Sequence, residues 1–149
     1  MKHRISHDQM DKTLKQLEDD YIKAVKDNKN TTIDGFVEQF LYDSWNYNYE
    51  NLELIQAVLR KYAQGDISKT IFQGAFNEMT DHLQGKLREL DPDQLYPLVH
   101  QPIGASILVS CVDGMIIQYF TNVYSIEDLN EMTPQIKRML LNALGTNES

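Results

Sequence analysis

An all-α domain is predicted by the hydrophobic pattern and the composition of this sequence. Apolar residues recur at steps of three and four along most of the 149 residues, as they do on one face of a helix, and no stretch alternates convincingly as a strand would. Only 7 Gly and 4 Pro interrupt the chain. With 42% hydrophobic residues, a chain of this length is able to bury one core. We therefore expect residues 1–149 to form a single domain of about six helices in an orthogonal bundle.

The first two helices are predicted from their apolar stripes. One covers about residues 6–28, with its apolar residues on one narrow side and charged residues on the others. The next opens at Thr31 or Thr32 and places its apolar and aromatic residues on one face. The aromatic and Asn-rich residues 45–49 break its pattern and are expected to end it.

A third and a fourth helix follow, separated by a glycine. The third covers about residues 52–62 and is expected to stop at Gly65. The fourth begins near residues 66–68 and ends before Pro92, because a residue that precedes proline avoids the helical region. Residues 93–102 contain two prolines and are predicted to be a connection with one turn of helix.

The last two helices differ in how their apolar residues are distributed. The fifth, about residues 102–123, is apolar on most sides, so most sides must be covered. The final helix starts at a capping box formed by Ser125 and Asp128, and it ends at Gly145. Pro134 predicts a kink or a restart within it.

The apolar surplus of these two helices predicts a homodimer. A monomer would expose a larger apolar patch than soluble monomers usually show. Pairing both helices with their symmetry mates in a four-helix bundle would cover that patch through one self-complementary contact. The residues predicted to form this interface are Val112, Ile116, Phe120, Ile136, Met139 and Leu140.

The charge and hydropathy of the sequence restrict the kinds of molecule that the protein is expected to bind. The net charge is −8, with +1 on residues 1–30 and −9 on residues 31–149, so the main body should repel nucleic acid and anionic lipid. The longest apolar run, residues 103–112, is too short to span a membrane, and the N-terminus lacks the apolar core of a signal peptide. We expect a soluble, cytoplasmic protein that itself binds neither DNA nor a membrane.

No catalytic motif is present in the sequence. Nucleotide-binding, hydrolase and redox motifs are absent, and the four histidines do not have the spacing of a metal site. The apolar context of Cys111 favours packing over reactivity. The acidic residues 18–20 are contiguous on a helix, so their side chains should fan out into solvent. We expect no enzymatic activity, no cofactor and no metal.

Aromatic and methionine residues gather on the inward faces of the second to fifth helices, and two interpretations stay open. They form either an ordinary core or the wall of a cavity for an apolar or amphipathic ligand. If there is a cavity, His82 is the expected polar contact, although a structural or surface histidine is the more common case. The residues predicted to line it are Phe40, Trp45, Tyr62, Phe72, Phe76, Met79, His82 and Met115.

The last third of the chain resembles a known family. Residues 104–144 contain small and apolar residues that lead to Asp113-Gly114, then an acidic break at residues 125–128, then an amphipathic helix. This order is similar to the end of the C-terminal domain of tetracycline-repressor-like (TetR family) transcriptional regulators. Helix number and order match that domain as well. The resemblance implies an effector-binding and dimerisation domain that controls an attached DNA reader.

One large departure separates the chain from that family. TetR-like regulators begin with a helix-turn-helix domain of roughly fifty residues, and nothing before His7 is able to form one. The chain is therefore expected to be either a regulatory domain cut from a longer protein or a natural product without the reader. Two functions follow: an effector sensor, or a ligand-free interaction module that pairs with itself or with a full-length relative.

Overall fold

The computed structural model describes residues 7–64 and 69–145, and all regular secondary structure in this part of the chain is helical. The prediction of an all-α fold is confirmed. The elements are α1 (His7–Asp27), α2 (Ile33–Glu50), α3 (Leu52–Ala63), α4 (Lys69–Glu89), the short 3-10 helix η1 (Pro97–His100), α5 (Pro102–Phe120) and α6 (Ile126–Leu144).

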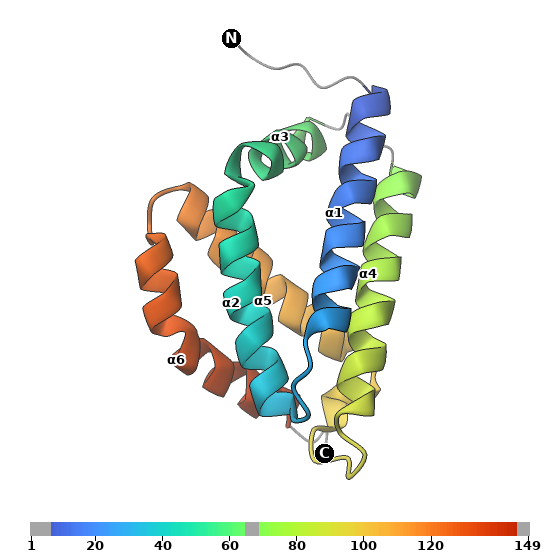
Figure 1. Ribbon diagram of the computed structural model, residues 1–149, viewed down its shortest axis with the longest axis vertical. Coiled ribbons are helices and arrows are strands. Elements are labelled where there is room, and N and C mark those ends of the chain that lie inside the picture. Colours follow the sequence, from blue (N-terminus) through green and yellow to red (C-terminus); the bar gives the residue numbers. More distant parts are fainter. Residues whose placement is uncertain (1–6, 65–68, 146–149) are drawn as a thin grey trace.

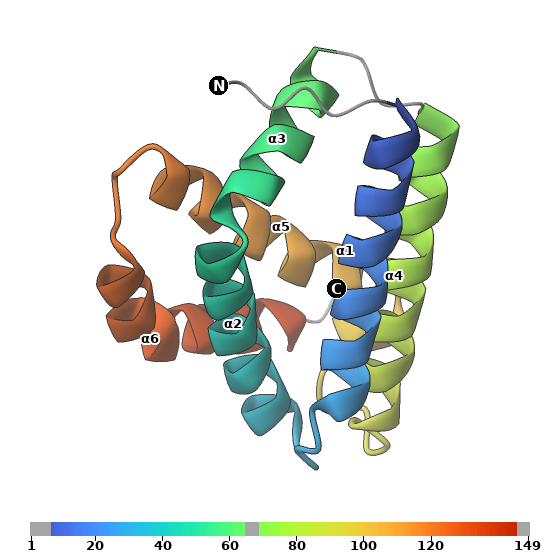
Figure 2. The ribbon, with the colours of Figure 1, turned by 45° about the horizontal axis from the view of Figure 1, so that its top comes forward.

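Two pairs of helices that are distant in sequence dominate the packing. α1 and α4 lie side by side and run in the same direction (Figures 1 and 2). α2 packs along α6, and α5 contacts α4, α2 and α6 as it crosses the molecule (Figure 1). The core lies where these elements meet.

The main core draws on every element except α3. Its largest fully buried side chains are Trp45, Phe36, Leu41, Leu83, Leu87, Leu108, Leu129 and Leu144. A second, smaller cluster joins Met10 and Leu14 of α1 to Val58 of α3. α3 is thus attached to the domain through its own contact with α1.

α2 is longer than its sequence pattern indicates. The helix continues through residues 45–49, and the predicted break there is wrong. The Tyr47 hydroxyl donates a 2.7 Å hydrogen bond to Asp20 of α1, and the Asn51 side chain donates a 2.9 Å bond back to the Tyr47 carbonyl. A contact with a helix 27 residues away therefore stabilises a segment whose local composition disfavours a helix.

The predicted start of α2 and the predicted capping box of α6 are confirmed. The Thr32 hydroxyl accepts a 3.1 Å hydrogen bond from the Gly35 N–H at the start of α2. Ser125 and Asp128 exchange the two reciprocal bonds of a capping box at the start of α6. The predicted stop at Gly65 and the predicted start at residues 66–68 lie outside the described residues.

A buried carboxylate organises the connection between α4 and α5. Asp91 accepts 2.9 Å hydrogen bonds from the N–H groups of Leu95 and Tyr96, and its Oδ2 lies 2.9 Å from Nε2 of His100. These three contacts fold the chain into η1, which is the single turn predicted for this connection.

Gln84 then fixes the start of α5. The N-cap Gln101 makes no capping bond with its side chain, and the buried Gln84 of α4 takes over part of that role. Its Oε1 accepts a 3.1 Å hydrogen bond from the Ala105 N–H, and its Nε2 donates to the Val99 carbonyl. A Cβ on Gly104 would lie 2.4 Å from the Leu98 carbonyl oxygen, so only glycine fits this crossing.

α6 continues through Pro134 without a restart and changes direction along its length (Figure 1). The residue before the proline joins α6 to α2. Thr133 is fully buried, and its hydroxyl accepts a 2.9 Å hydrogen bond from Nε1 of Trp45 while it donates to the Leu129 carbonyl. The two helices are therefore linked by a specific polar contact within an apolar core.

Candidate functional site

The first candidate site is the outward face of α5, which is exposed at both ends of the helix and partly covered between them. Ile103 and Ile117 are 51% and 54% exposed, near the two ends of the helix. Between them lie small side chains and one half-buried isoleucine. We call this surface the α5 face, formed by Ile103, Ser106, Ile107, Ser110, Gly114 and Ile117.

Gly114 has no packing role within the protomer. A glycine in a helix interior costs roughly 1 kcal/mol relative to alanine. At Gly114 an added Cβ would meet no atom of the described residues within 4 Å, so packing within this part of the chain does not require the glycine. Small residues let two helices approach closely, and a helix from another molecule would account for it.

α5 also stands out by its hydropathy. Of the described helices, it is the one long and apolar enough to cross a membrane by length and composition, a test that the core helix of a soluble protein also passes. Asp113 borders the α5 face and is exposed.

The residues predicted for the dimer interface divide between the inside and the outside of the protomer. Met139 is 71% exposed and Phe120 is half-buried. The other four are buried within the protomer's own core, which corrects their placement on an outer surface: Val112, Ile116, Ile136 and Leu140. The surplus apolar surface of α5 is instead the opposite side of the helix, the α5 face.

The residues predicted to line an apolar cavity are spread between the core and the surface, and two of them are buried. Trp45 is 0% exposed and Phe40 is buried, where it packs on Phe36 and against the edge of Tyr21. Met79 and Met115 are half-buried, and His82 is exposed. The side chains of the other three lie outside the described part of the structure: Tyr62, Phe72 and Phe76.

Among the described residues, two buried polar atoms on α1 have no hydrogen-bond partner, Oε1 of Glu18 and the hydroxyl of Tyr21. Glu18 is only 5% exposed, which corrects the expectation that residues 18–20 all face solvent. The neighbouring Glu78 carboxyl group on α4 and burial together raise the pKa of Glu18. Burial, with a smaller effect of the Asp113 charge, raises the pKa of Tyr21.

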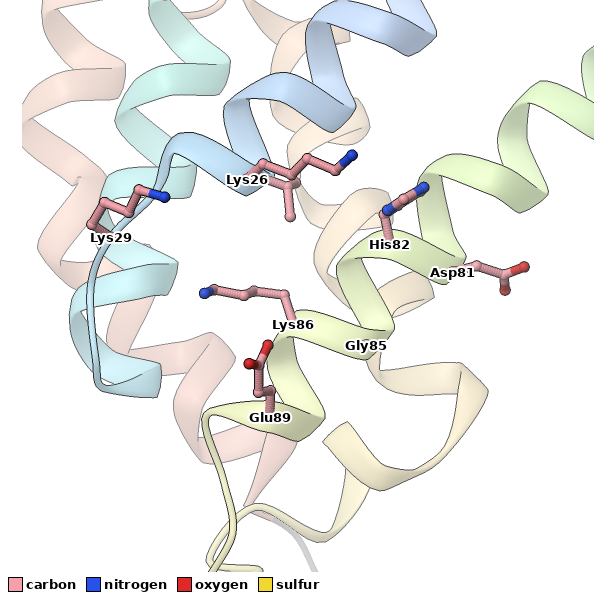
Figure 3. Close-up of a pocket in the computed structure, with 8 residues that line it drawn as sticks. Lys26, Lys29, Asp81, His82, Gly85, Lys86 and Glu89 are labelled. Atoms are coloured by element: carbon pink, nitrogen blue, oxygen red, sulfur yellow. The ribbon is translucent and has the colours of Figure 1, made fainter.

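The second candidate site is a groove between α1 and α4, with a volume of about 580 Å³ (Figure 3). We call it the α1–α4 groove. It is lined by Val25, Lys26, Lys29, Asp81, His82, Gly85, Lys86 and Glu89. Sequence reasoning singled out only His82, because the lysines are spread over two helices and a linker and form no local motif.

Within residues 7–64 and 69–145, no group of three or more His, Cys, Asp and Glu side chains is placed to hold a metal ion. No protein-family model, curated protein or solved structure matches the chain. The resemblance to TetR-like regulators therefore stays a prediction, and the function has to be argued from these two surfaces.

Proposed function

We propose that this chain is a homodimeric helical regulatory domain of the TetR-like type, and that two copies meet through the α5 face. The observation that supports this most directly is the exposed apolar surface of α5 around a helix-interior glycine with open space above it. A partner helix would cover the isoleucines and use the space beside Gly114.

The order of residues on the α5 face favours a second copy over an unrelated partner. In an antiparallel crossing centred on Ser110, Ile103 of one copy meets Ile117 of the other, and Ser106 meets Gly114. Small residues thus oppose small residues at the centre, and isoleucines oppose each other at the ends, while Ile107 lies opposite Asp113 at the border of the face. A two-fold contact requires such a self-complementary surface.

Sedimentation of the purified chain tests the proposal. The wild type should be a dimer at micromolar concentration, and Ile117→Lys should be a monomer with unchanged far-UV circular dichroism, because the contact would otherwise bury an unpaired charge. Leu95→Lys is the matched control, since Leu95 is 70% exposed in the connection before α5. A monomeric wild type, or a control that dissociates the dimer equally, would refute the proposal. A monomer that floats with lipid vesicles would assign the α5 face to a membrane instead.

Met139→Lys distinguishes the α5 face alone from the four-helix bundle predicted from the sequence. Met139 is exposed on α6, so its lysine variant should fold normally. If the variant remains a dimer, the contact is confined to α5. If it dissociates, α6 takes part, as in the bundle of both helices.

The effector-sensing role is a second proposal, favoured by the unpaired Tyr21 hydroxyl beside Phe40. A buried polar group without a partner is costly, and a ligand that supplies the missing hydrogen bond would remove the cost. Nile red, an uncharged apolar dye, tests for such a ligand site. Saturable binding of one dye per chain supports the sensor, whereas no binding at micromolar concentration supports the ligand-free interaction module.

A further inference from the structure

Three lysines from different segments line the α1–α4 groove, with the ammonium group of Lys26 on the side of His82 and those of Lys29 and Lys86 at the other end (Figure 3). Lys26 comes from the last turn of α1, Lys29 from the linker that follows, and Lys86 from α4 (Figure 3). None of the three makes an ion pair within 4 Å in the described part of the chain. Lys15, Lys23 and Lys137, in contrast, each pair with one or two carboxylates. The chain has 22 Asp and Glu against 14 Lys and Arg, so unpaired lysines do not result from a shortage of carboxylates.

Helix ends explain only part of this arrangement. α1 and α4 both end beside the groove, and cations near helix C-termini interact favourably with the helix dipole. That accounts for Lys26 and Lys86. Lys29 lies beyond the end of α1, and its side chain extends back along the groove (Figure 3). The end of α1 and the neighbouring Asp27 also attract this ammonium group, so the common ligand has to be argued from the presence of all three lysines in one groove.

Gly85 contributes no side chain to the α1–α4 groove. It lies inside α4, where glycine is unfavourable, and a Cβ there would meet no atom within 4 Å. Packing therefore does not require the glycine. Any larger side chain would enter the groove and occupy the space between the lysines.

Two carboxylates border the groove. The Asp81 side chain points away from it, whereas Glu89 points toward the space between Lys86 and Lys29 (Figure 3). Glu89 is thus the one lining carboxylate directed among the lysines, and it would compete with an incoming anion. With Glu89 counted and His82 neutral, the groove still has an excess of positive charge.

From these observations we propose that the α1–α4 groove binds a small phosphorylated anion. Ammonium groups are strong hydrogen-bond donors to phosphate oxygens, and His82 adds a ring N–H. The volume of about 580 Å³ is in the range of small-molecule sites. The buried Val25 at the wall offers an apolar contact for the rest of the ligand.

The net charge of the chain favours a small anion over nucleic acid as the ligand of the groove. A net charge of −8 repels a long polyanion such as duplex DNA. A small ligand in the groove interacts mainly with charges within the Debye length, about 8 Å at physiological salt. Among the lining residues these are three lysines against Asp81 and Glu89, which leaves a positive balance.

Calorimetric titration of the purified chain with sodium pyrophosphate tests the proposal. Wild type should bind one pyrophosphate per chain, more weakly as salt increases. Lys29→Met and Lys86→Met should each weaken binding about tenfold, the loss of one charge-assisted hydrogen bond. Glu89→Gln should strengthen it. Lys12→Met and Glu131→Gln are the controls, because both residues are exposed outside the groove and the charge changes are identical.

Three results would overturn the proposal: no saturable binding at millimolar pyrophosphate, equal weakening by Lys12→Met, or displacement of pyrophosphate by a DNA duplex at equal phosphate concentration. The last result would indicate that the lysines bind nucleic acid instead of a small anion. The test is independent of dimerisation, since Ile117→Lys changes a different helix and should retain pyrophosphate binding. Failure of one proposal therefore leaves the other intact.

Discussion

Replacement of Gln84 by methionine should destabilise the domain strongly, although methionine has nearly the same length and shape. The substitution leaves the Ala105 N–H and the Val99 carbonyl buried without their side-chain partner. An unsatisfied buried polar group costs about 1–3 kcal/mol. For two such groups we expect a loss of about 2–6 kcal/mol in the free energy of unfolding, or roughly 4–24 °C in Tm for a domain of this size.

Urea unfolding followed by circular dichroism measures this loss, at one fixed protein concentration because a dimer's stability depends on it. Gln135→Met is the matched control, since Gln135 is exposed on α6. The reasoning is refuted if Gln84→Met costs less than about 0.5 kcal/mol, the range of ordinary surface substitutions.

A second variant, Gln84→Glu, separates hydrogen bonding from packing. Its carboxylate still accepts from Ala105 but faces the Val99 carbonyl without a proton to donate. Protonation restores the donor, so the folded-state pKa of the new carboxyl group should lie above the unfolded one. The free energy of unfolding of this variant, relative to wild type, should therefore increase as pH falls through the folded-state pKa. It should decrease again as pH rises through the same pKa. A pH-independent difference would show that the two bonds do not hold this junction.

Three further predictions concern other buried contacts. Thr133→Val leaves Nε1 of Trp45 unpaired and should cost about 1–3 kcal/mol, measured by urea unfolding, with Thr133→Ser expected to retain most of the stability. Gly104→Ala forces a Cβ against the Leu98 carbonyl and should cost about 1–3 kcal/mol, whereas the same change at an open glycine such as Gly85 should be neutral or stabilising. Glu18 has a raised pKa in the folded state, so the wild type should lose stability as pH rises from about 4.3, the ordinary glutamate pKa, through the folded-state pKa. Glu18→Gln should remove that loss when unfolding is measured as a function of pH. A variant with the same pH profile as the wild type would contradict this prediction.

Local signals allowed much of the fold to be predicted. The start of α2 after Thr32 and the capping box at Ser125 depend on residues within one helical turn, and both are present as expected. The end of α2 was wrong because Tyr47 contacts Asp20 of another helix, which no local pattern indicates.

The orientation of α5 was not predictable for a different reason. A helix that is apolar on most sides has no polar face to show which side turns outward. Val112 and Ile116 were expected outside and are buried, while Ile117 is exposed. The α1–α4 groove could not be predicted at all, because it forms only when Lys86 is brought beside the end of α1.

The pairing of the helices has a consequence for how the chain reaches its fold. α1 begins at residue 7 and packs beside α4, which begins at residue 69, and α2 from residue 33 packs on α6 from residue 126. Such non-local contacts require large loops to close before they stabilise anything, so folding should be slower than in a bundle of sequence neighbours. During synthesis, the apolar side of α2 with Trp45 must wait for the last helix to be made. The nascent chain is therefore exposed to aggregation until its C-terminal segment leaves the ribosome.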